Sequence, residues 1–345
     1  MSVGLLERLA AGPVICAEGY LFEFERRGYL QAGAYVPEVV LEQPEMVAGL
    51  HREFVHAGSD VVEAFTYYAH REKLRLIGRE DDLEPMNRQA LELARGVARE
   101  SGALLAGNIC NTNIYVSGDA QSAAAVRAMF VEQVAWAAEA GVDFVIAETL
   151  SWVEEALIAA EVVQQAGLPV VVTLAIHREG LTREGWTPAD ACARLEQAGA
   201  DVVGLNCIRG PWTMLPLLPA IRDAVSCPVV ALPVPYRTTE AEPTFQSLTD
   251  GAACPADAGQ PFPTGLDPFV CTRHEIAEFG RQAQALGVDY LGVCCGAGAH
   301  HIRALAEALG RTPPASRFSP DMSKHAFFGT NPQLLEENQA YKERL

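Results

Sequence analysis

Short apolar runs of strand length alternate along this chain with longer amphipathic segments of helix length. Between the runs lie stretches such as residues 122–141 and 153–167, which are long enough for several helical turns. This alternation is typical of repeated βα units that build a parallel sheet. Eight runs follow it, and they cover residues 13–19, 59–68, 103–109, 142–149, 169–176, 201–207, 227–234 and 288–295.

A recurring phrase marks the junctions between these segments. "AGSD", "AGVD", "AGLP", "AGAD" and "LGVD" each stand where an amphipathic segment ends and an apolar run begins. Glycine at that point suits the left-handed residue that ends many helices. Eight strands alternating with helices in 345 residues favour an α/β protein with a closed (β/α)8, or TIM, barrel over an open doubly wound sheet. No G-x-G-x-x-G follows the first run, which weakens the dinucleotide-binding alternative.

Three segments depart from a minimal barrel. Residues 20–36 and the Pro-rich residues 235–270 are long for loops in a compact domain, and such loops are usually functional or disordered. The chain after about residue 311 looks irregular and finishes in a short charged helix within residues 333–345. We therefore predict a barrel domain over residues 1–310. A short C-terminal extension, 311–345, would pack on the surface or against another subunit of a homo-oligomer.

Composition narrows the class of protein. The 26 basic and 44 acidic residues give a formal charge of −18, which argues against nucleic acid as a partner. The first residues lack a basic segment followed by an apolar core, and no run of about 18 apolar residues occurs, so we expect a cytoplasmic protein that does not enter membranes. Nine cysteines are odd in number and too sparse for a disulfide scaffold, which favours catalysis or metal binding for some of them.

Chemically active side chains stand at the ends of several predicted strands. In a barrel the site forms at the carboxyl ends of the strands, so these side chains should converge on one rim. They are Glu18 at the end of the first run, Tyr67 and Tyr68 at that of the second, Glu148 at that of the fourth, Cys207 at that of the sixth, and Cys294 and Cys295 at that of the eighth. The other cysteines fit buried core positions better: Cys16, Cys110, Cys192, Cys227, Cys254 and Cys271.

Cys207, Cys294 and Cys295 could together hold a zinc ion, because soft thiolates suit zinc. Neighbouring residues of a regular strand point to opposite faces, but at a strand end Gly296 frees the backbone and lets Cys294 and Cys295 face one ion. Three protein ligands leave one tetrahedral position for a substrate, as in catalytic sites. His300 and His301 lie close by, but they begin a helix and are expected to position or cap it.

Two cysteine motifs, "VGLNC" ending at Cys207 and "GVCCG" at 292–296, resemble those of the homocysteine S-methyltransferases. The likeness is greatest to the betaine–homocysteine S-methyltransferases and extends from about residue 4 to 310. It includes the phrases "LHREFVHAGSDVVEAFTYYA" (50–69), "IAETLSWVEEA" (146–156), "PFPTGLDPFVCTRHEI" (261–276) and "HIRALAEAL" (301–309).

The resemblance implies a zinc barrel in which Cys207, Cys294 and Cys295 bind the ion and activate the thiol of homocysteine. The thiolate then takes a methyl group from a cationic donor and becomes methionine. Glu18 and Glu148 align with the family carboxylates that hold the amino group of homocysteine, and the aromatic residues that surround the donor align with Tyr68 and Tyr35.

Departures from the family pattern leave the donor open. Glu18-Gly19-Tyr20 replaces Asp-Gly-Gly, and Thr149 replaces a tyrosine that contacts the donor or the metal. A smaller residue at 149 suggests a differently shaped donor, so a sulfonium such as S-methylmethionine or dimethylsulfoniopropionate is an alternative to a betaine. From a different class, a non-catalytic zinc sensor or a redox protein using Cys294 and Cys295 also fits the cysteines.

The role assigned to Glu148 gives a first prediction. Glu148→Gln should weaken homocysteine binding by about tenfold to a hundredfold, because a hydrogen bond between charged groups contributes about 1.5–3 kcal/mol. Zinc content should stay unchanged, since the carboxylate is not one of the proposed ligands. A thiol titration of metal-loaded protein measures both, and an affinity equal to that of the wild type would contradict the assigned role.

Overall fold

A closed barrel of eight parallel strands forms the centre of the computed structural model, which describes residues 3–249 and 260–345. Each strand pairs with the next along the chain, and β8 pairs with β1. All eight predicted runs contain a strand, which confirms the (β/α)8 architecture. The strands are β1 (Val14–Ala17), β2 (Val61–Glu63), β3 (Leu104–Cys110), β4 (Phe144–Leu150), β5 (Val170–Leu174), β6 (Val202–Asn206), β7 (Val229–Leu232) and β8 (Tyr290–Val293).

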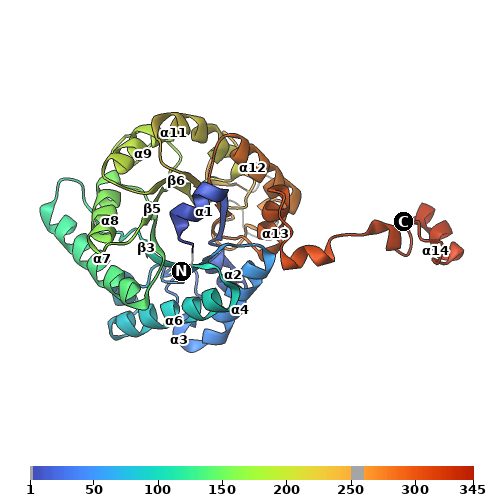
Figure 1. Cartoon of the computed structure of the whole chain (residues 1–345), viewed down its shortest axis with the longest axis horizontal. Coiled ribbons are helices and arrows are strands. Elements are labelled where there is room, and N and C mark those ends of the chain that lie inside the picture. Colours follow the sequence, from blue (N-terminus) through green and yellow to red (C-terminus); the bar gives the residue numbers. More distant parts are fainter. Residues whose placement is uncertain (1–2, 250–259) are drawn as a thin grey trace.

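Helices surround the strands as an outer ring (Figure 1). The helices that connect successive strands are α4 (Pro44–Ala57), α6 (Leu83–Ser101), α7 (Ala120–Ala140), α8 (Val153–Gln165), α9 (Pro188–Gln197), α11 (Leu218–Ala224) and α12 (Arg273–Ala285), with α13 (Ala299–Ala308) after β8. Shorter ones are α1 (Leu5–Ala11), α2 (Tyr20–Arg26), α3 (Val39–Glu42), α5 (Arg71–Leu76), α10 (Pro211–Met214) and α14 (Glu336–Tyr341). Within the described ranges, none of the helices has the length and apolar character needed to cross a membrane.

The recurring junction phrase has two structural functions. Its glycines take the left-handed conformation that ends a helix, with φ of 117° at Gly58, 73° at Gly141, 75° at Gly167, 93° at Gly199 and 78° at Gly287. Where the phrase contains aspartate, the carboxylate accepts a hydrogen bond from a backbone N–H of a neighbouring strand. These bonds join Ile15 to Asp60 (2.8 Å), Leu105 to Asp143 (2.8 Å), Val170 to Asp201 (2.8 Å) and Val229 to Asp289 (3.1 Å). Each therefore fixes one strand to the next.

The segment 20–36 differs from the predicted long loop, because its first part is the helix α2. Tyr20, Leu21, Phe22 and Phe24 are buried, so this helix forms by packing an apolar face onto the rim of the barrel. Arg26 then donates hydrogen bonds to the Tyr236 hydroxyl and to the Gly296 carbonyl, both at 3.1 Å. The segment is thus an ordered part of the rim.

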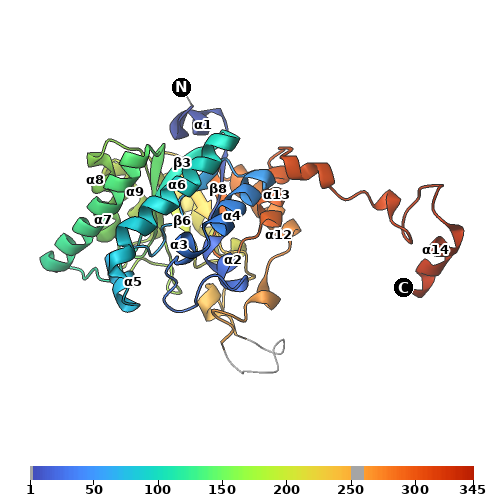
Figure 2. The same cartoon turned by 90° about the horizontal axis from the view of Figure 1, so that it is seen from below.

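The segment 235–270 is described except for residues 250–259. Its described parts include two short 3-10 helices, η3 (Phe245–Ser247) and η4 (Asp267–Phe269), and an antiparallel bridge between Tyr236 and Val270. In Figure 2 these parts lie at the end of the barrel opposite α1. The prediction for Cys254 falls outside the described residues.

The C-terminal extension leaves the barrel after α13 and reaches outward in both views (Figures 1 and 2). It contains the 3-10 helices η5 (Pro314–Phe318) and η6 (Met322–Lys324) before α14, followed by η7 (Lys342–Arg344). The short terminal helix predicted within residues 333–345 is confirmed by α14. Apolar side chains such as Phe318 and Leu335, each 68% exposed, lie open on this extension.

The seam between β1 and β8 depends on the absence of a side chain at Gly292. A Cβ atom there would overlap the Cys16 carbonyl oxygen and the Leu232 side chain. We expect Gly292→Ala to destabilise the fold by about 3 kcal/mol, since the strands must separate to make room. Gly96→Ala is the control, because a Cβ at this position in α6 meets nothing within 4 Å and should stabilise the helix by about 0.5–1 kcal/mol. Denaturant unfolding compares the two, and similar shifts would contradict this account.

Candidate active site

The three predicted sulfur ligands come together at the carboxyl ends of β6 and β8. Sγ atoms of Cys207, Cys294 and Cys295 all lie within 4.8 Å of one another. Cys207 and Cys294 are buried, whereas Cys295 is half-buried. Three thiols at this spacing, each offering one sulfur, could hold a metal ion that prefers soft ligands.

Backbone bends at both strand ends produce this convergence. Cys207 and Ile208 adopt left-handed φ values of 55° and 59°, and Gly296 follows the cysteine pair with φ of 92°. A side chain at Gly296 would overlap the Tyr236 hydroxyl. Such conformations cost about 1–3 kcal/mol at non-glycine residues and persist only where surrounding contacts fix them. The expected role of Gly296 in freeing the turn agrees with this geometry.

Each of the three thiols changes the pKa of the others. Hydrogen bonds from Cys294 and Cys295 lower the pKa of Cys207 well below its usual value. Burial, together with hydrogen bonding to Cys207, raises the pKa of Cys294 well above the ordinary range, and the hydrogen bond with Cys207 also raises that of Cys295. Cys207 is therefore the first of the three to become a thiolate, stabilised by its two neighbours.

A small acidic cavity of about 20 Å³ lies on one side of the sulfur cluster, where Cys294 and Cys295 form part of its wall. Glu18, Glu63 and Glu148 line it, each at most 5% exposed. Burial raises the pKa of all three carboxyl groups: it places that of Glu148 at about 7, and neighbouring carboxylates add to the increase for Glu18 and Glu63. Two of these residues, Glu18 and Glu148, were predicted from the sequence.

Two asparagines connect the acidic groups. The Asn108 side-chain amide donates to Glu63 at 2.5 Å and to Glu148 at 2.6 Å. Asn206 donates to Glu148 at 2.7 Å and lies 3.9 Å from the Cys294 sulfur, so the carboxylate network reaches the sulfur cluster. Sequence reasoning missed Glu63, Asn108 and Asn206. The available signal was a polar residue inside an otherwise apolar strand, because burial there requires a partner.

Several acceptors in this cavity have no hydrogen-bond partner among the described residues. They are both carboxylate oxygens of Glu18, Oε2 of Glu63 and Oδ1 of Asn108. A buried acceptor without a donor costs about 1–3 kcal/mol. The cavity is therefore complementary to a ligand that brings N–H or O–H groups.

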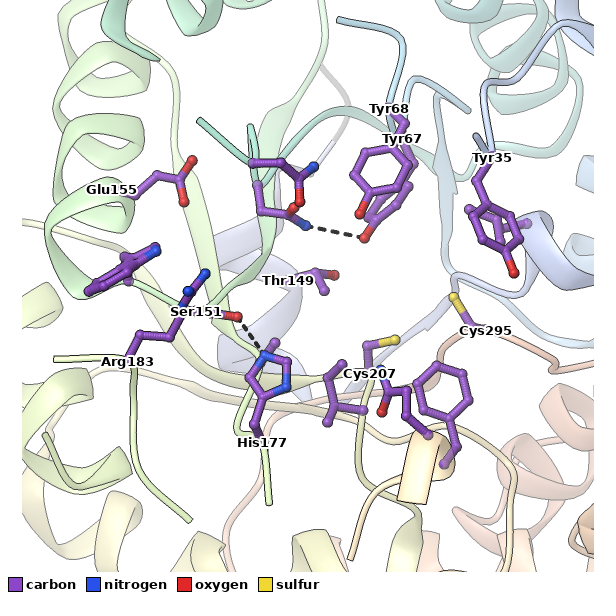
Figure 3. Close-up of a pocket in the computed structure, with 18 of the residues that line it drawn as sticks. Tyr35, Tyr67, Tyr68, Thr149, Ser151, Glu155, His177, Arg183, Cys207 and Cys295 are labelled. Atoms are coloured by element: carbon purple, nitrogen blue, oxygen red, sulfur yellow. Dashed lines mark hydrogen bonds between the residues drawn. The ribbon is translucent and has the colours of Figure 1, made fainter. Parts of the chain in front are cut away.

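A larger cavity of about 280 Å³ also borders the sulfur cluster (Figure 3). Cys207 and Cys295 line it, and Figure 3 places Tyr35 close to Cys295, with Tyr67 and Tyr68 along one wall. Its wall is rich in aromatic rings: Phe22, Tyr35, Tyr67, Tyr68, Tyr115, Trp152, Phe245 and Phe262. Aromatic faces attract alkylated ammonium groups.

Three residues predicted on the donor side, Tyr35, Tyr68 and Thr149, line this cavity in different ways. Tyr35 lies at its edge, and Thr149 hydrogen-bonds through Oγ1 to Glu148 at 3.1 Å. Lys73 covers one face of the Tyr68 ring, with Nζ 3.9 Å from the centroid, and the Tyr67 ring lies 4.4 Å from that of Tyr68. Tyr68 therefore supports Tyr67, which lines both cavities and was noted in the sequence only as a strand-end residue.

Tyr20 differs from its expected place at the donor side. Its hydroxyl is 3.1 Å from Nδ1 of His51, and its ring packs against Phe54 and Phe65. It lines the acidic cavity and not the aromatic one. The replacement at position 20 therefore gives no information about the shape of the donor cavity.

Polar groups gather at the end of the aromatic cavity remote from Tyr35 (Figure 3). Ser151 Oγ lies 2.9 Å from Nε2 of His177, and the Arg183 guanidinium stacks over Trp152 at 4.6 Å. Arg183 has no carboxylate within ion-pair distance in the part of the chain that the structure describes. The cavity thus has aromatic rings beside the sulfurs, and its other end carries the Arg183 guanidinium together with the carboxyl group of Glu155.

Backbone strain is concentrated in the same place. Six non-glycine residues of the described chain have positive φ: Tyr35, Tyr68, Asn113, Thr149, Cys207 and Ile208. All six line the aromatic cavity. Residues held in this rarely populated conformation gather at functional sites, where the surrounding fold determines their position.

Most remaining candidates behave as the sequence suggested, although Cys227, expected in the core, is only half-buried. His301 caps α13 through Nδ1, which accepts from the Gly298 N–H at 3.2 Å, while Nε2 lies 2.9 Å from the Cys271 carbonyl oxygen. Cys192 and Cys271 are buried. Cys110 is also buried, but its sulfur accepts the Tyr68 N–H at 3.2 Å and so supports the rim.

Together, the fold and the site define a barrel enzyme whose thiol cluster borders both an acidic cavity and an aromatic one. Residues 19–309 match the family described as homocysteine S-methyltransferase. The chain is 36% identical to betaine–homocysteine S-methyltransferase 1 of Xenopus tropicalis, covering 96% of this chain and 81% of that protein. It is 37% identical to the S-methylmethionine–homocysteine S-methyltransferase of Rattus norvegicus, over 94% and 86%. The chain therefore belongs to the homocysteine S-methyltransferase family.

A solved structure shares the fold. The metallated form of the homocysteine methyltransferase MmuM from Escherichia coli superposes with a TM-score of 0.66, at 20% identity, over 87% of this chain and 98% of that one. At this identity the likeness concerns the barrel and not the residues of the site.

The sulfur cluster gives a prediction about metal content. Cys207→Ala removes the sulfur that forms a thiolate first, so bound metal should fall from about one atom per chain to near zero after dialysis against a mild chelator. Cys227→Ala is the matched control, since this half-buried cysteine precedes β7 outside both cavities. Elemental analysis of the purified variants measures the difference. Full metal content in Cys207→Ala would rule out the three-sulfur site.

Proposed function

We propose that this protein transfers a methyl group from a betaine-like quaternary ammonium donor to the thiolate of homocysteine, giving methionine. The observation that carries the proposal is that the sulfur cluster lines two adjoining cavities of different chemistry. An amino acid in one cavity and an alkylated cation in the other could then meet at the sulfurs. In the transfer a C–S bond forms, a C–N bond breaks, and its electron pair remains on the departing neutral amine.

The acidic cavity is suited to the amino group of homocysteine. Its unpartnered acceptors require hydrogen-bond donors, which a primary ammonium supplies and a quaternary ammonium lacks. Glu18 and Glu148 would hold that group, and Asn206 keeps Glu148 in place through its 2.7 Å hydrogen bond. The substrate thiol would then point toward Cys294 and Cys295, which form part of the cavity wall.

Zinc fits the cluster, because three thiolate donors match its preference and leave one coordination position. Cys207, Cys294 and Cys295 would hold it. Bound there, zinc supplies positive charge that lowers the pKa of the substrate thiol. The protein's own contribution is to hold the three sulfurs together, to fix the amino group, and to align the thiolate with the methyl group.

The aromatic cavity is suited to the donor. Tyr35 and Tyr67, near the sulfurs, offer rings to the methylated cation. At the other end Arg183, with Ser151 and His177, offers positive charge and hydrogen bonds to an anionic group. A donor that carries a cation at one end and a carboxylate at the other would use both ends, as a betaine does.

A sulfonium donor is the second candidate. Thr149 leaves space where the family pattern has a tyrosine, and the cavity continues past it to Arg183. A longer zwitterion with a sulfonium group would occupy this space, and a relative at 37% identity carries S-methylmethionine in its name. Donors of both classes would contact the same aromatic rings and the same Arg183 guanidinium. Only a measurement of turnover therefore distinguishes them.

A donor panel tests the proposal. Zinc-loaded protein with homocysteine should form methionine from glycine betaine. Its kcat/KM for choline, which has the same cation without the carboxylate, should be about tenfold to a hundredfold lower, because choline cannot bind Arg183. S-methylmethionine and dimethylsulfoniopropionate complete the panel, with methionine measured by chromatography. Turnover of sulfonium donors alone would reject the betaine assignment in favour of the second candidate.

A further inference from the structure

Glu63 takes part in the acidic cavity but has no role in the chemistry described so far. It ends β2, is 3% exposed, and receives the Asn108 amide on Oε1 at 2.5 Å. Its other oxygen, Oε2, has no hydrogen-bond partner among the described residues, although the residue lines the cavity. Its burial beside Glu18 and Glu148 disfavours a third negative charge, and a positively charged ligand would offset that cost.

The unpartnered acceptors match one kind of cation. They belong to three residues on neighbouring strands: Glu18 directly after β1, Glu63 at the end of β2, and Asn108 in β3. A primary ammonium has three N–H donors, and it can give one to each of these three residues. A secondary ammonium has two such donors and a quaternary ammonium has none.

The size of the cavity leads to the same conclusion. Its volume of about 20 Å³ is close to the 10–15 Å³ that one water-sized group needs. Phe65 and Tyr67 help to close it, and the rings of Tyr20 and Phe65 stack with centroids 5.5 Å apart, so little room remains for a methyl group on the nitrogen.

We infer that Glu63 is a specificity-determining residue that, with Glu18 and Asn108, makes the acidic cavity selective for primary ammonium groups. This inference rests on the proposed function, because it assigns the homocysteine half of the same site. It has a consequence for a methyltransferase with an N-methylated donor. The donor and its demethylated product, which is still a tertiary amine or its ammonium, are excluded from the amino-acid side and bind only on the aromatic side.

The test compares three thiols with zinc-loaded full-length protein and a saturating donor. They are homocysteine, N-methylhomocysteine and 4-sulfanylbutanoate, which lacks the amino group. Wild-type kcat/KM should be about tenfold to a hundredfold lower for each analogue than for homocysteine. This comparison does not depend on the folding of any variant. Equal use of N-methylhomocysteine and homocysteine would overturn the inference.

Glu63→Gln keeps the size of the side chain and removes its charge. It should lower kcat/KM for homocysteine by about tenfold to a hundredfold and leave 4-sulfanylbutanoate unchanged, so that discrimination between the two thiols falls. An equal decrease for both thiols would mean a purely structural role and would overturn the inference. The control is Glu196→Gln, whose carboxylate binds the backbone N–H groups of Ser226 and Cys227 outside both cavities. It should leave both values unchanged.

Two further measurements distinguish a failure of this inference from a failure of the proposed function. Cys16, Glu18 and Glu63 also lie close enough to share a cation. The number of metal atoms per chain is therefore measured in the wild-type protein and in Glu63→Gln. A second metal atom per chain that Glu63→Gln loses would overturn the ammonium assignment. If wild-type protein methylates no thiol with any donor, the proposed function fails. Calorimetric titration of the three thiols then still decides whether the cavity selects a primary ammonium.

Discussion

The pairing of β8 with β1 is the constraint on which the site depends. Closure of the barrel matches Ala17 with Val293 and brings the Glu18 N–H to the Val293 carbonyl at 3.1 Å. Residues nearly 280 positions apart therefore meet, and the acidic group that follows β1 lies beside the cysteine pair that follows β8. Small residues make this approach possible, because Gly19 touches the backbone of Ala297 and Gly292 touches that of Cys16. Without the seam, the acidic cavity would not combine Glu18 with the wall that Cys294 and Cys295 form.

Side-chain amides supply hydrogen bonds to some, but not all, of the buried carboxylates at the rim. Asn108 and Asn206 each connect two acidic or sulfur-bearing groups, and this reduces the cost of burying Glu63 and Glu148. Glu18 receives no hydrogen bond among the described residues. Under the proposed function, the ammonium group of homocysteine would satisfy these acceptors, so its binding would also stabilise the fold. The acceptors that lack partners in the free protein would then favour ligands that bring N–H donors.

The residues with strained backbone conformations line the aromatic cavity. Left-handed residues appear at the ends of β2, β4 and β6 and in the turn that carries Tyr35, all around one cavity. Each bend directs a side chain inward where a regular strand would continue. The aromatic packing of α2 and the bond from Arg26 to the Gly296 carbonyl fix the rim against these bends. Rigid support of this kind is what precise alignment of two substrates requires.

The sequence by itself determined the barrel and its eight strands, because apolar runs and helix-ending glycines reflect short-range chemistry. Strand-end positions indicated Glu18, Tyr68, Glu148 and the three sulfurs as site residues. The family resemblance assigned their expected roles and added Tyr35.

Only the tertiary structure decided which side chains share a cavity. Glu63 and Asn108 lie 45 positions apart and meet because β2 and β3 are neighbours, with Glu63 paired in register to Ala106. It also placed Tyr20 against His51 and away from the donor cavity, covered Tyr68 with Lys73, and made an ordered helix of the first part of residues 20–36. These outcomes follow from packing between distant segments, which no local pattern encodes.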